Sequence, residues 1–333
     1  MNVLPPRVSP ALSGELPFSP RGRGPDDETK GTSLWQDALL RLKKNRMAMA
    51  CALVLLLLFL FCFAGPFPAE LLFGVDPHAQ DVLLGASPPS WQHPFGTDLL
   101  GRDMLARVMQ GGRLSLLVGL AATFVSITIG VFYGAVAGYA GGRVDNLMMR
   151  VVDVLYALPY MFLVIILMVL VRALRERLSV PEPFEWLLHP TLVLFVALGA
   201  VQWLTMARIV RGQVLSLKRR EFVAAARTIG VSPLRILTRH LVPNTLGPVI
   251  VYTTLTVPSV ILQEAFLSFL GLGVEAPDAS WGTLVDVGRR SMAVYPWLLI
   301  FPAVFLAATI YSLNALGDGL RDALDPQMRK DAK

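Results

Sequence analysis

Residues 47–64 read MAMACALVLLLLFLFCFA, a run of eighteen consecutive apolar residues. A helix of about this length crosses the hydrocarbon core of a bilayer. The polar segment before it, residues 1–46, contains eight basic residues and is much longer than the leader of a secretory signal. We therefore expect an uncleaved transmembrane helix whose leader lies on the inner side of the membrane.

The composition of the whole chain is typical of a membrane protein. Of its 333 residues, 54% are hydrophobic and only 16% are charged, whereas soluble domains average about 25% charged residues. The mean hydropathy of +0.56 also argues against a water-soluble globular enzyme. The formal net charge of +6 agrees either with nucleic-acid binding or with basic loops on one side of a membrane, and its distribution separates these alternatives.

Five further apolar segments follow the first. They predict spans at approximately 114–140, 150–171, 190–210, 245–268 and 294–315, and hence an all-α fold with six transmembrane helices. The second span contains Gly130, Gly134 and Gly138, a spacing that allows another helix to approach closely. The third contains Pro159, a residue tolerated at bends of membrane helices. The amphiphilic segment Gly101–Arg113 is expected to lie along the membrane surface.

The basic residues divide unequally between the two sides that six spans define. With the N-terminus inside, the inner segments contain 22 of the 30 Lys and Arg residues, and the outer segments contain 8. This division agrees with the positive-inside rule and predicts that both termini are cytoplasmic. The inner segments are 1–46, 141–150, 208–243 and 316–333.

The chain has no pattern typical of redox, metal or phosphate chemistry. Cys51 and Cys62 would lie roughly 16 Å apart on one helix, too far for a disulfide, and we interpret both as small apolar core residues. The four histidines are scattered without metal-ligand spacing. None of the six lysines follows a glycine-rich phosphate loop. We therefore expect a chain that is not an enzyme and binds no cofactor of its own.

The loop between the fourth and fifth spans, residues 208–243, contains eight basic residues and the pattern of two short helices. The first is expected over Glu221–Ile229 and should end at Gly230, a residue type favoured after helix C-termini. The second is expected to run from a Ser232-Pro233 cap to Pro243. The apolar stripe of the first helix consists of Phe222, Ala225, Ala226 and Ile229.

This loop has two alternative interpretations. A DNA-binding helix-turn-helix also pairs short helices around a glycine. Here the pair is tethered between two membrane spans and presents mainly alanine, whereas base recognition uses Arg, Asn or Gln, so we expect no nucleic-acid partner. A helix on the lipid surface would explain the basic residues but not Ala225, Ala226 and Gly230.

At this loop the sequence resembles the inner-membrane permease subunits of bacterial ABC importers. Their signature is Glu-Ala-Ala, three further residues, Gly, and then, after nine intervening residues, Ile-x-Leu-Pro. The corresponding residues here are Ala224–Ala226, Gly230 and His240–Pro243. Ala224 stands where the family has Glu, and this replacement puts in question one polar contact expected with the ATPase.

Four further motifs, at residues 93–103, 206–213, 264–273 and 317–322, are similar to the peptide/nickel branch of this family. The resemblance covers approximately residues 33–328 and is closest to the C-type permeases of oligopeptide importers. The expected organisation has four parts. They are a flexible cytoplasmic tail (1–32), a region with a surface helix, the first span and a periplasmic loop (33–113), a core permease domain (114–316) and a cytoplasmic C-terminal tail (317–333).

The resemblance implies the type I importer fold in the bacterial inner membrane. It also implies partners: a homologous B-type permease, two cytoplasmic ATPases that bind ATP and Mg²⁺, an external peptide-binding protein, and a peptide that crosses the bilayer. The chain would then form half of an oligopeptide pathway. Dipeptide, murein-peptide and nickel importers share much of this framework and stay open as alternatives. An ion-coupled secondary transporter, a further alternative, is expected to have more intramembrane carboxylates.

The resemblance also implies that the first loop helix docks in a groove of an ATPase. Its apolar stripe would enter the groove, and three arginines would flank it. The expected docking residues are Arg219, Arg220, Glu221, Phe222, Ala224, Ala225, Ala226, Arg227, Ile229 and Gly230.

Polar residues within the spans are the candidates for the substrate path. They are Gln202, Trp203 and Thr205 in the fourth span, Glu264 in the fifth and Asn314 in the sixth. Each either contacts the substrate or joins helices by hydrogen bonds. Glu264 faces either a cavity near the outer end or a buried hydrogen-bonded site. Asp153 is expected to pair with Arg150, one helical turn earlier.

Overall fold

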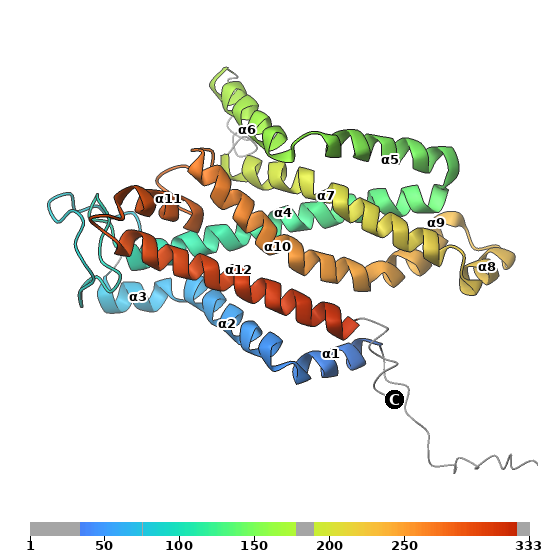
Figure 1. Ribbon diagram of the computed structural model, residues 1–333, viewed down its shortest axis with the longest axis horizontal. Helices are drawn as coiled ribbons and strands as arrows, with labels where there is room; N and C mark the ends of the chain where they lie inside the picture. Colours follow the sequence, from blue (N-terminus) through green and yellow to red (C-terminus); the bar gives the residue numbers. More distant parts are fainter. Residues whose placement is uncertain (1–33, 75, 178–189, 325–333) are drawn as a thin grey trace, which may run out of the picture.

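The computed structural model describes residues 34–74, 76–177 and 190–324, so the tail expected over residues 1–32 lies outside the described part. Within these ranges the named elements are all helices, and the long ones form an elongated bundle (Figure 1). Five helices are long and apolar enough to cross a membrane, and a bent pair supplies a sixth span. The prediction of an all-α protein with six spans is therefore confirmed.

The six spans and the shorter helices have the following bounds. The spans are α2 (Arg46–Phe63), α4 (Met104–Ala140), the pair α5 (Gly142–Ala157) and α6 (Tyr160–Arg177), α7 (Pro190–Leu217), α10 (Leu246–Phe269) and α12 (Trp297–Leu324). The shorter helices are α1 (Leu34–Lys44), α3 (Pro66–Phe73), α8 (Glu221–Thr228), α9 (Pro233–Arg235) and α11 (Trp281–Ser291).

The third span differs from the straight helix expected over residues 150–171. It starts earlier, at Gly142, and bends by 83° between α5 and α6. Leu158 at the break has an extended backbone, with φ −79° and ψ 136°. The cause is Pro159, because proline disfavours the helical conformation of the residue before it. Figure 1 shows α6 turning away from the bundle beyond this break.

The segment Gly101–Arg113 does not lie along the membrane surface, and that prediction was wrong. Asp103 caps α4, since its Oδ1 accepts a hydrogen bond from the Ala106 N–H at 2.9 Å. The helix then continues without interruption to Ala140, and its first turns, residues 104–109, are buried. The apolar residues of this segment pack against α3 and against Phe95 of the loop before α4 instead of against lipid.

The glycines of α4 allow the backbones of α4 and α7 to approach closely, as their spacing predicts. A Cβ atom on Gly134 would lie 2.3 Å from the carbonyl oxygen of Ala207 on α7. A Cβ atom on Gly130 would lie 2.5 Å from that of Met206. We call this contact the glycine seam. Since lipid provides no hydrophobic drive for helix association, such close packing is what holds the two spans together.

Two ion pairs join α5 to α7 beside the glycine seam. Arg211 binds both carboxylate oxygens of Asp145, through Nε at 2.5 Å and Nη2 at 2.7 Å, and Asp145 is buried. Asp153 pairs with Arg208 at 2.8 Å. The predicted pair with Arg150 was therefore wrong. The arginine on the neighbouring span takes the place of the one on the same helix, because α5 packs against α7.

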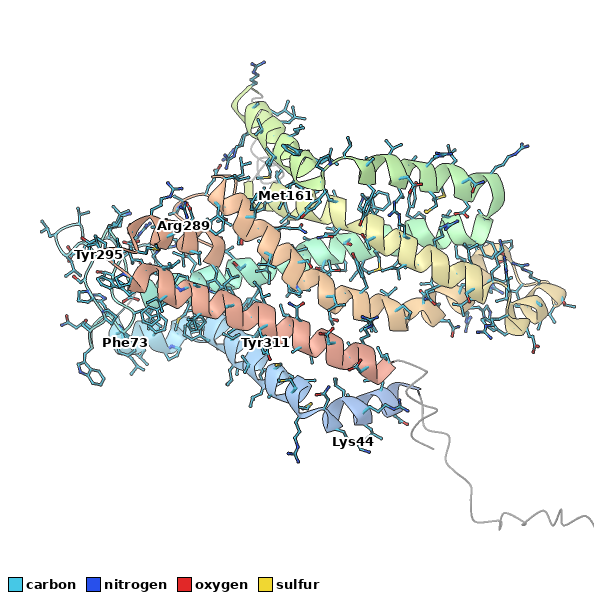
Figure 2. All side chains as sticks on the ribbon, in the orientation of Figure 1. Lys44, Phe73, Met161, Arg289, Tyr295 and Tyr311 are labelled. Carbon is cyan, nitrogen blue, oxygen red and sulfur yellow. The ribbon has the colours of Figure 1, made fainter. Side chains whose placement is uncertain are left out.

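Helices α2 and α12 pack together on the other side of the bundle, where Tyr311 approaches Met47 (Figure 2). A Cβ atom on Gly319 would lie 2.6 Å from that of Ala48, so the end of α12 contacts the start of α2 closely. Helix α12 extends to Leu324. Residues 317–324, expected within the C-terminal tail, are therefore helical.

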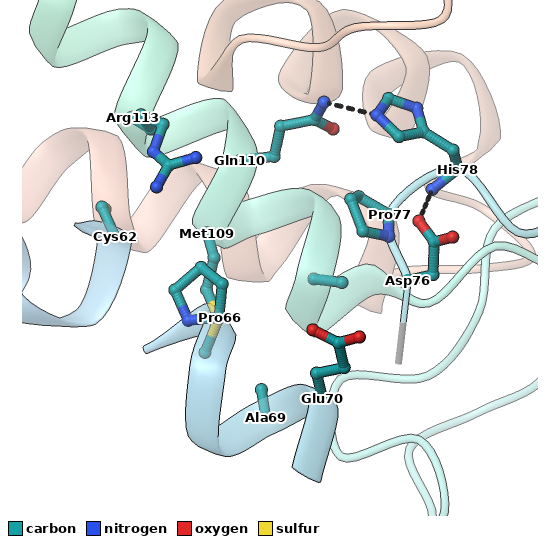
Figure 3. Close-up of a pocket in the computed structure, with 11 residues that line it drawn as sticks. Cys62, Pro66, Ala69, Glu70, Asp76, Pro77, His78, Met109, Gln110 and Arg113 are labelled. Atoms are coloured by element: carbon teal, nitrogen blue, oxygen red, sulfur yellow. Dashed lines mark hydrogen bonds between the residues drawn. The ribbon is translucent and has the colours of Figure 1, made fainter. Parts of the chain in front are cut away.

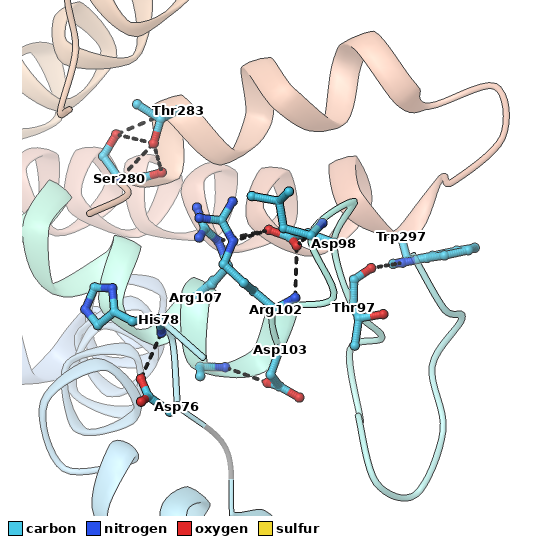
Figure 4. A network of polar contacts seen from close by, with 12 residues as sticks. Asp76, His78, Thr97, Asp98, Arg102, Asp103, Arg107, Ser280, Thr283 and Trp297 are labelled. Atoms are coloured by element: carbon cyan, nitrogen blue, oxygen red, sulfur yellow. Dashed lines mark hydrogen bonds and ion pairs between the residues drawn. The ribbon is translucent and has the colours of Figure 1, made fainter. Parts of the chain in front are cut away.

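Buried aspartates organise the loop between α3 and α4 (Figure 4). Asp98 accepts hydrogen bonds from the backbone of Leu100 and from the Arg102 side chain, the latter at 2.8 Å. The Trp297 indole donates to the carbonyl oxygen of Thr97 at 3.1 Å and so ties this loop to the start of α12. These contacts close the end of the bundle that carries α3 and α11.

On α11, the carboxyl of Asp286 lies between two arginines of the same helix. Burial alone raises the pKa of Asp286. The hydrogen bonds from Arg289 and Arg290 outweigh that effect and hold this pKa below its usual value. Asp286 therefore stays ionised at neutral pH.

Substituting Gly134 by alanine tests the glycine seam. Because the new methyl group meets the Ala207 carbonyl, we expect Gly134→Ala to reduce the free energy of unfolding by about 1–3 kcal/mol. The measurement is the midpoint of thermal unfolding of the purified protein in detergent. Gly212→Ala on α7 is the matched control, since its added Cβ meets no atom within 4 Å. Equal midpoints for the two variants would contradict the seam.

Candidate functional site

The loop helix α8 lies at the end of the bundle opposite to α3 and α11 (Figure 1). It begins after Arg220, which has an extended backbone, and ends at Thr228. Gly230 follows with φ +78°, in the left-handed region that favours glycine. The Val231 N–H then donates to the Ala226 carbonyl oxygen at 3.0 Å. The predicted short helix with a glycine stop is confirmed.

Helix α8 is seated on the chain's own spans by one of its faces. Val223 and Ala226 are buried in an apolar cluster with residues of α4, α7 and the start of the fifth span, among them Val210, Val214 and Ile236. We call this cluster the α8 seat. The interpretation of Ala226 as part of the outward stripe was therefore wrong.

The outward face of α8 consists of the other members of the predicted stripe. Phe222 is 41% exposed and Ile229 is 79% exposed, and Ala225 between them is also exposed. An isolated Phe or Ile on a surface is unremarkable, but these two lie on one short helix at the tip of the molecule. The face can take a partner without displacing the α8 seat.

Cations surround α8, and some of them attach it to α4. Lys218 donates to the carbonyl oxygen of Tyr139 at the end of α4. The Arg227 guanidinium lies 6.0 Å from the centre of the Tyr139 ring, within reach of a cation–π interaction. The remaining predicted docking residues, Arg219, Arg220, Glu221 and Ala224, are exposed. The loop thus presents positive charge around an apolar patch.

The second loop helix does not end at Pro243 as expected. Helix α9 continues through a wider π turn at Ile236–Leu241 and a tight 3₁₀ turn at Val242–Thr245 directly into α10. Proline lacks an N–H, so regular α-helical hydrogen bonding is interrupted there, and the change of helix type accommodates the gap. Ser232 occupies the cap position, but its side chain makes no cap hydrogen bond.

Two cavities lie along α7 and α10 and share Tyr252. One, of about 430 Å³, is bounded by α7, α10 and the break between α5 and α6. The other, of about 620 Å³, continues toward the α8 end and reaches α12. We call the two together the α7–α10 groove. The polar side chains of the first cavity are Tyr156, Tyr160, Gln202, Thr205, Tyr252, Ser259 and Gln263.

The polar residues predicted for the substrate path divide between different places. Gln202 and Thr205 line the groove. Trp203 does not line it: its ring packs edge-on against Tyr133 of α4, with ring centres 4.8 Å apart. Asn314 is exposed on α12 and lines neither of these cavities. Two of these four residues therefore belong to the groove.

Several groove residues were missed from the sequence, although a signal for them existed. On α7 four of the six lining residues recur every three or four positions and so mark one helical face. On α10, Ser259 and Gln263 have the same spacing. A search for polar residues at helical spacing, rather than for single polar residues, would have found them. These four residues of α7 are Gln202, Thr205, Ile209 and Gln213, and Val201 and Leu204 line the groove beside them.

Glu264 is a buried structural residue and does not face the groove. Its Oε1 accepts hydrogen bonds from the hydroxyls of Ser268 at 2.8 Å and Ser280 at 2.6 Å, and its Oε2 accepts a longer one from Ser115. These partners belong to α10, to the start of α11 and to α4. Of the two possibilities for Glu264, the buried hydrogen-bonded site is the observed one.

A third cavity, of about 370 Å³, lies at the opposite end between α2, α3 and α4 (Figure 3). The Gln110 amide approaches the His78 ring at 3.1 Å and donates to Asp278 at 2.9 Å. Cys62 contributes to this cavity as a free, buried thiol, and Cys51 is free and buried as well. Among the described residues, no group of three or more His, Cys, Asp and Glu side chains is placed to hold a metal ion.

Comparisons with known proteins agree on one family. Residues 114–330 match the family described as binding-protein-dependent transport system inner membrane component. Residues 33–89 match the N-terminal transmembrane domain of oligopeptide transport permease C. The two matches together cover most of the chain.

Curated relatives align along nearly their whole length. The oligopeptide transport system permease protein OppC of Escherichia coli is 49% identical over 91% of this chain and 94% of its own. OppC of Haemophilus influenzae is 46% identical over 91% of both chains. The dipeptide transport system permease protein DppC of Bacillus subtilis is 47% identical over 91% of this chain and 90% of its own.

A solved structure is similar in fold. A chain of the MetNI methionine ABC transporter, in inward-facing conformations, superposes with a TM-score of 0.50 at 17% identity. The match covers 67% of this chain and 98% of that chain. At this identity the likeness establishes the fold, which is that of an ABC importer transmembrane subunit.

Substitutions at Glu264 test its structural role. Glu264→Leu leaves the hydroxyls of Ser268 and Ser280 without an acceptor, and each unsatisfied group costs about 1–3 kcal/mol. Glu264→Gln keeps an oxygen acceptor in the same place and should lose much less stability. The measurement is thermal unfolding of the two purified variants. A Leu variant as stable as the Gln variant would contradict the role.

Proposed function

We infer the function of this chain from its family: it belongs to the binding-protein-dependent transport system inner membrane components. It is a multi-pass protein of the bacterial inner membrane and a permease subunit for oligopeptide transport. The observation that carries this conclusion is the similarity to oligopeptide permeases along nearly the whole chain. The fold of an ABC importer subunit agrees with it.

We propose that the chain forms one half of the path and that a homologous B-type permease forms the other. The α7–α10 groove is bounded by α5, α6, α7, α10 and α12 of this chain alone. A closed passage for a peptide needs an opposing wall, which a second subunit of the same fold would supply. An external peptide-binding protein would deliver the cargo to the end that carries α3 and α11.

The lining of the groove suits peptides of varied sequence. The residues that line its first cavity are uncharged, and its phenol, hydroxyl and amide groups can exchange hydrogen bonds with main-chain amides. A path needs contacts weak enough for the cargo to leave. Dipeptide transport is the second candidate, and the DppC relative favours it. Murein-peptide and nickel transport remain as further cargo alternatives.

Two cytoplasmic ATPases would drive transport by pushing on α8. The ATPases would bind α8 through Phe222 and Ile229 on its outward face. Their closure on ATP and Mg²⁺ would therefore move this helix. The α8 seat contains residues of α7 and of the fifth span, which are also the helices that carry the groove. Motion of α8 is therefore transmitted to the walls of the path through buried apolar contacts.

Reconstitution of the complete transporter tests the proposed function. Vesicles that contain this chain, its companion permease and the ATPases should accumulate a labelled tripeptide only with ATP inside and binding protein outside. Vesicles without this chain should show no uptake. Uptake by the chain alone, driven by an ion gradient, would overturn the proposal in favour of a secondary transporter.

Removing the outward apolar side chains of α8 tests the coupling. We expect the double substitution Phe222→Ala, Ile229→Ala to reduce ATPase stimulation by loaded binding protein about tenfold or more, because each side chain contributes roughly 1.5–3 kcal/mol when buried. ATPase rates of the reconstituted complex measure this effect. Leu57→Ala removes a side chain that is 56% exposed in the middle of α2, away from α8 and from the end that carries α3, and should leave stimulation unchanged. Unaltered ATPase stimulation in the double variant would contradict the proposed coupling role of α8.

Labelling of introduced cysteines tests the expectation that both termini are cytoplasmic. Cys51 and Cys62 are buried, so the native chain should react little. In spheroplasts, a membrane-impermeant maleimide should label Leu83→Cys on the outer loop at once. It should label Thr228→Cys on α8 only after permeabilisation. The reverse pattern would contradict the topology.

A further inference from the structure

An ion pair at the edge of the groove is not needed to hold the fold. Asp153 on α5 and Arg208 on α7 are 2.8 Å apart, with side chains 59% and 41% exposed. Ion pairs with this exposure contribute little to stability. The same two helices are already joined by Arg211 and the buried Asp145. The exposed ion pair is therefore not required to hold α5 and α7 together.

The same pair lies on two helices that belong to membrane spans. Charged side chains on spanning helices almost always face a water-filled path or another protein, since lipid does not solvate them. A charged pair that adds little stability and lies within spans is a candidate for contact with the cargo. The next question is whether it adjoins the path.

The helical spacing places the pair directly beside the first cavity. Tyr156 lies one turn along α5 from Asp153, and Thr205 lies one turn along α7 from Arg208. Tyr156 and Thr205 both line the cavity, and their hydroxyls are 3.3 Å apart. The direction from Thr205 to Arg208 along α7 leads toward α8. The ion pair lines neither cavity itself but adjoins the first one through Tyr156 and Thr205, whereas the second cavity, which continues toward α8, contains Arg321.

Arg208 can change partner without losing its position. Its guanidinium lies 4.2 Å over the ring of Tyr156, a cation–π contact independent of Asp153. If a passing anion displaces the aspartate, the stacked guanidinium stays at the mouth of the cavity. The other charges on the facing stretches of α5 and α7 are Arg150, which makes no ion pair within the described residues, and the Asp145–Arg211 pair.

We propose that Arg208 and Asp153 bind the charged ends of the transported peptide, an inference that rests on the proposed function. Every unblocked peptide has one terminal carboxylate and one terminal ammonium group, whatever its sequence. The Arg208 guanidinium matches a carboxylate with two parallel hydrogen bonds, and the Asp153 carboxylate accepts from an ammonium. The pair then selects for free termini and not for side chains.

The pairing of the two residues also prevents the cargo from being trapped. An isolated arginine beside the path would hold a carboxylate tightly. Because Asp153 lies beside Arg208, the terminal carboxylate of the cargo competes with the Asp153 carboxylate, and the terminal ammonium group competes with the Arg208 guanidinium. Bound cargo is therefore readily released. Conduction requires such a balance between binding and release.

The experiment uses the reconstituted transporter and three forms of one tripeptide: free, C-terminally amidated and N-acetylated. Uptake of each form is divided by that of the wild-type transporter with the same binding protein, which removes the preference of that protein. We expect Arg208→Gln to reduce uptake of the free form about tenfold or more, because the charge-assisted hydrogen bonds to its carboxylate are lost, and to reduce uptake of the amide far less. Asp153→Asn should likewise reduce uptake of the free form and should reduce uptake of the N-acetylated form far less.

Arg150→Gln is the matched control, because it removes a charge from the same helix, one turn from Asp153, and should change none of the three uptake rates. Equal losses for all three peptide forms in Arg208→Gln would overturn the proposal and leave the pair as a contact between subunits or helices. Unchanged uptake in both groove variants would overturn it as well. Absence of uptake by the wild-type transporter would instead refute the proposed function.

Discussion

The close contact between α4 and α7 is the constraint on which the other features depend. In a bilayer, helices associate through packing and hydrogen bonds rather than through hydrophobic drive. The glycine seam brings the α7 backbone against α4 and so fixes the rotation of α7. That rotation directs Gln202 and Thr205 into the groove and Val210 and Val214 into the α8 seat. One contact thus orients both the path and the support of the loop helix.

The distribution of charge separates two tasks along the molecule. Positive charge is concentrated around α8, where residues 218–240 contain six basic residues and a single acid, Glu221. The first cavity of the groove is lined by uncharged residues. Between these regions lie Asp153 and Arg208, where a charged group of the cargo can be compensated. The net charge of +6 is therefore concentrated in the loop that we propose as the docking site for the ATPases.

Much of this architecture is predictable from the sequence because membrane spans depend on local composition. The six spans, the glycine seam and the turn at Gly230 all follow from residue type and spacing. The errors concern orientation. An eight-residue helix with apolar residues on two sides does not reveal which side is buried, so Ala226 was assigned outward. Likewise Trp203 and Tyr252 look alike in isolation, and only the neighbouring helices decide that Tyr252 lines the groove and Trp203 does not.

The glycine seam has a consequence for the biosynthesis of the protein. Gly130 and Met206 meet across it, yet the whole of α5 and α6 is synthesised between them. Helix α4 therefore leaves the ribosome and enters the bilayer with its glycine face uncovered, and it must wait for α7. During this interval the narrow, small-residue face is open to any other helix with a similar stripe. The order of translation thus makes the first half of the chain an assembly intermediate that is vulnerable to wrong pairing.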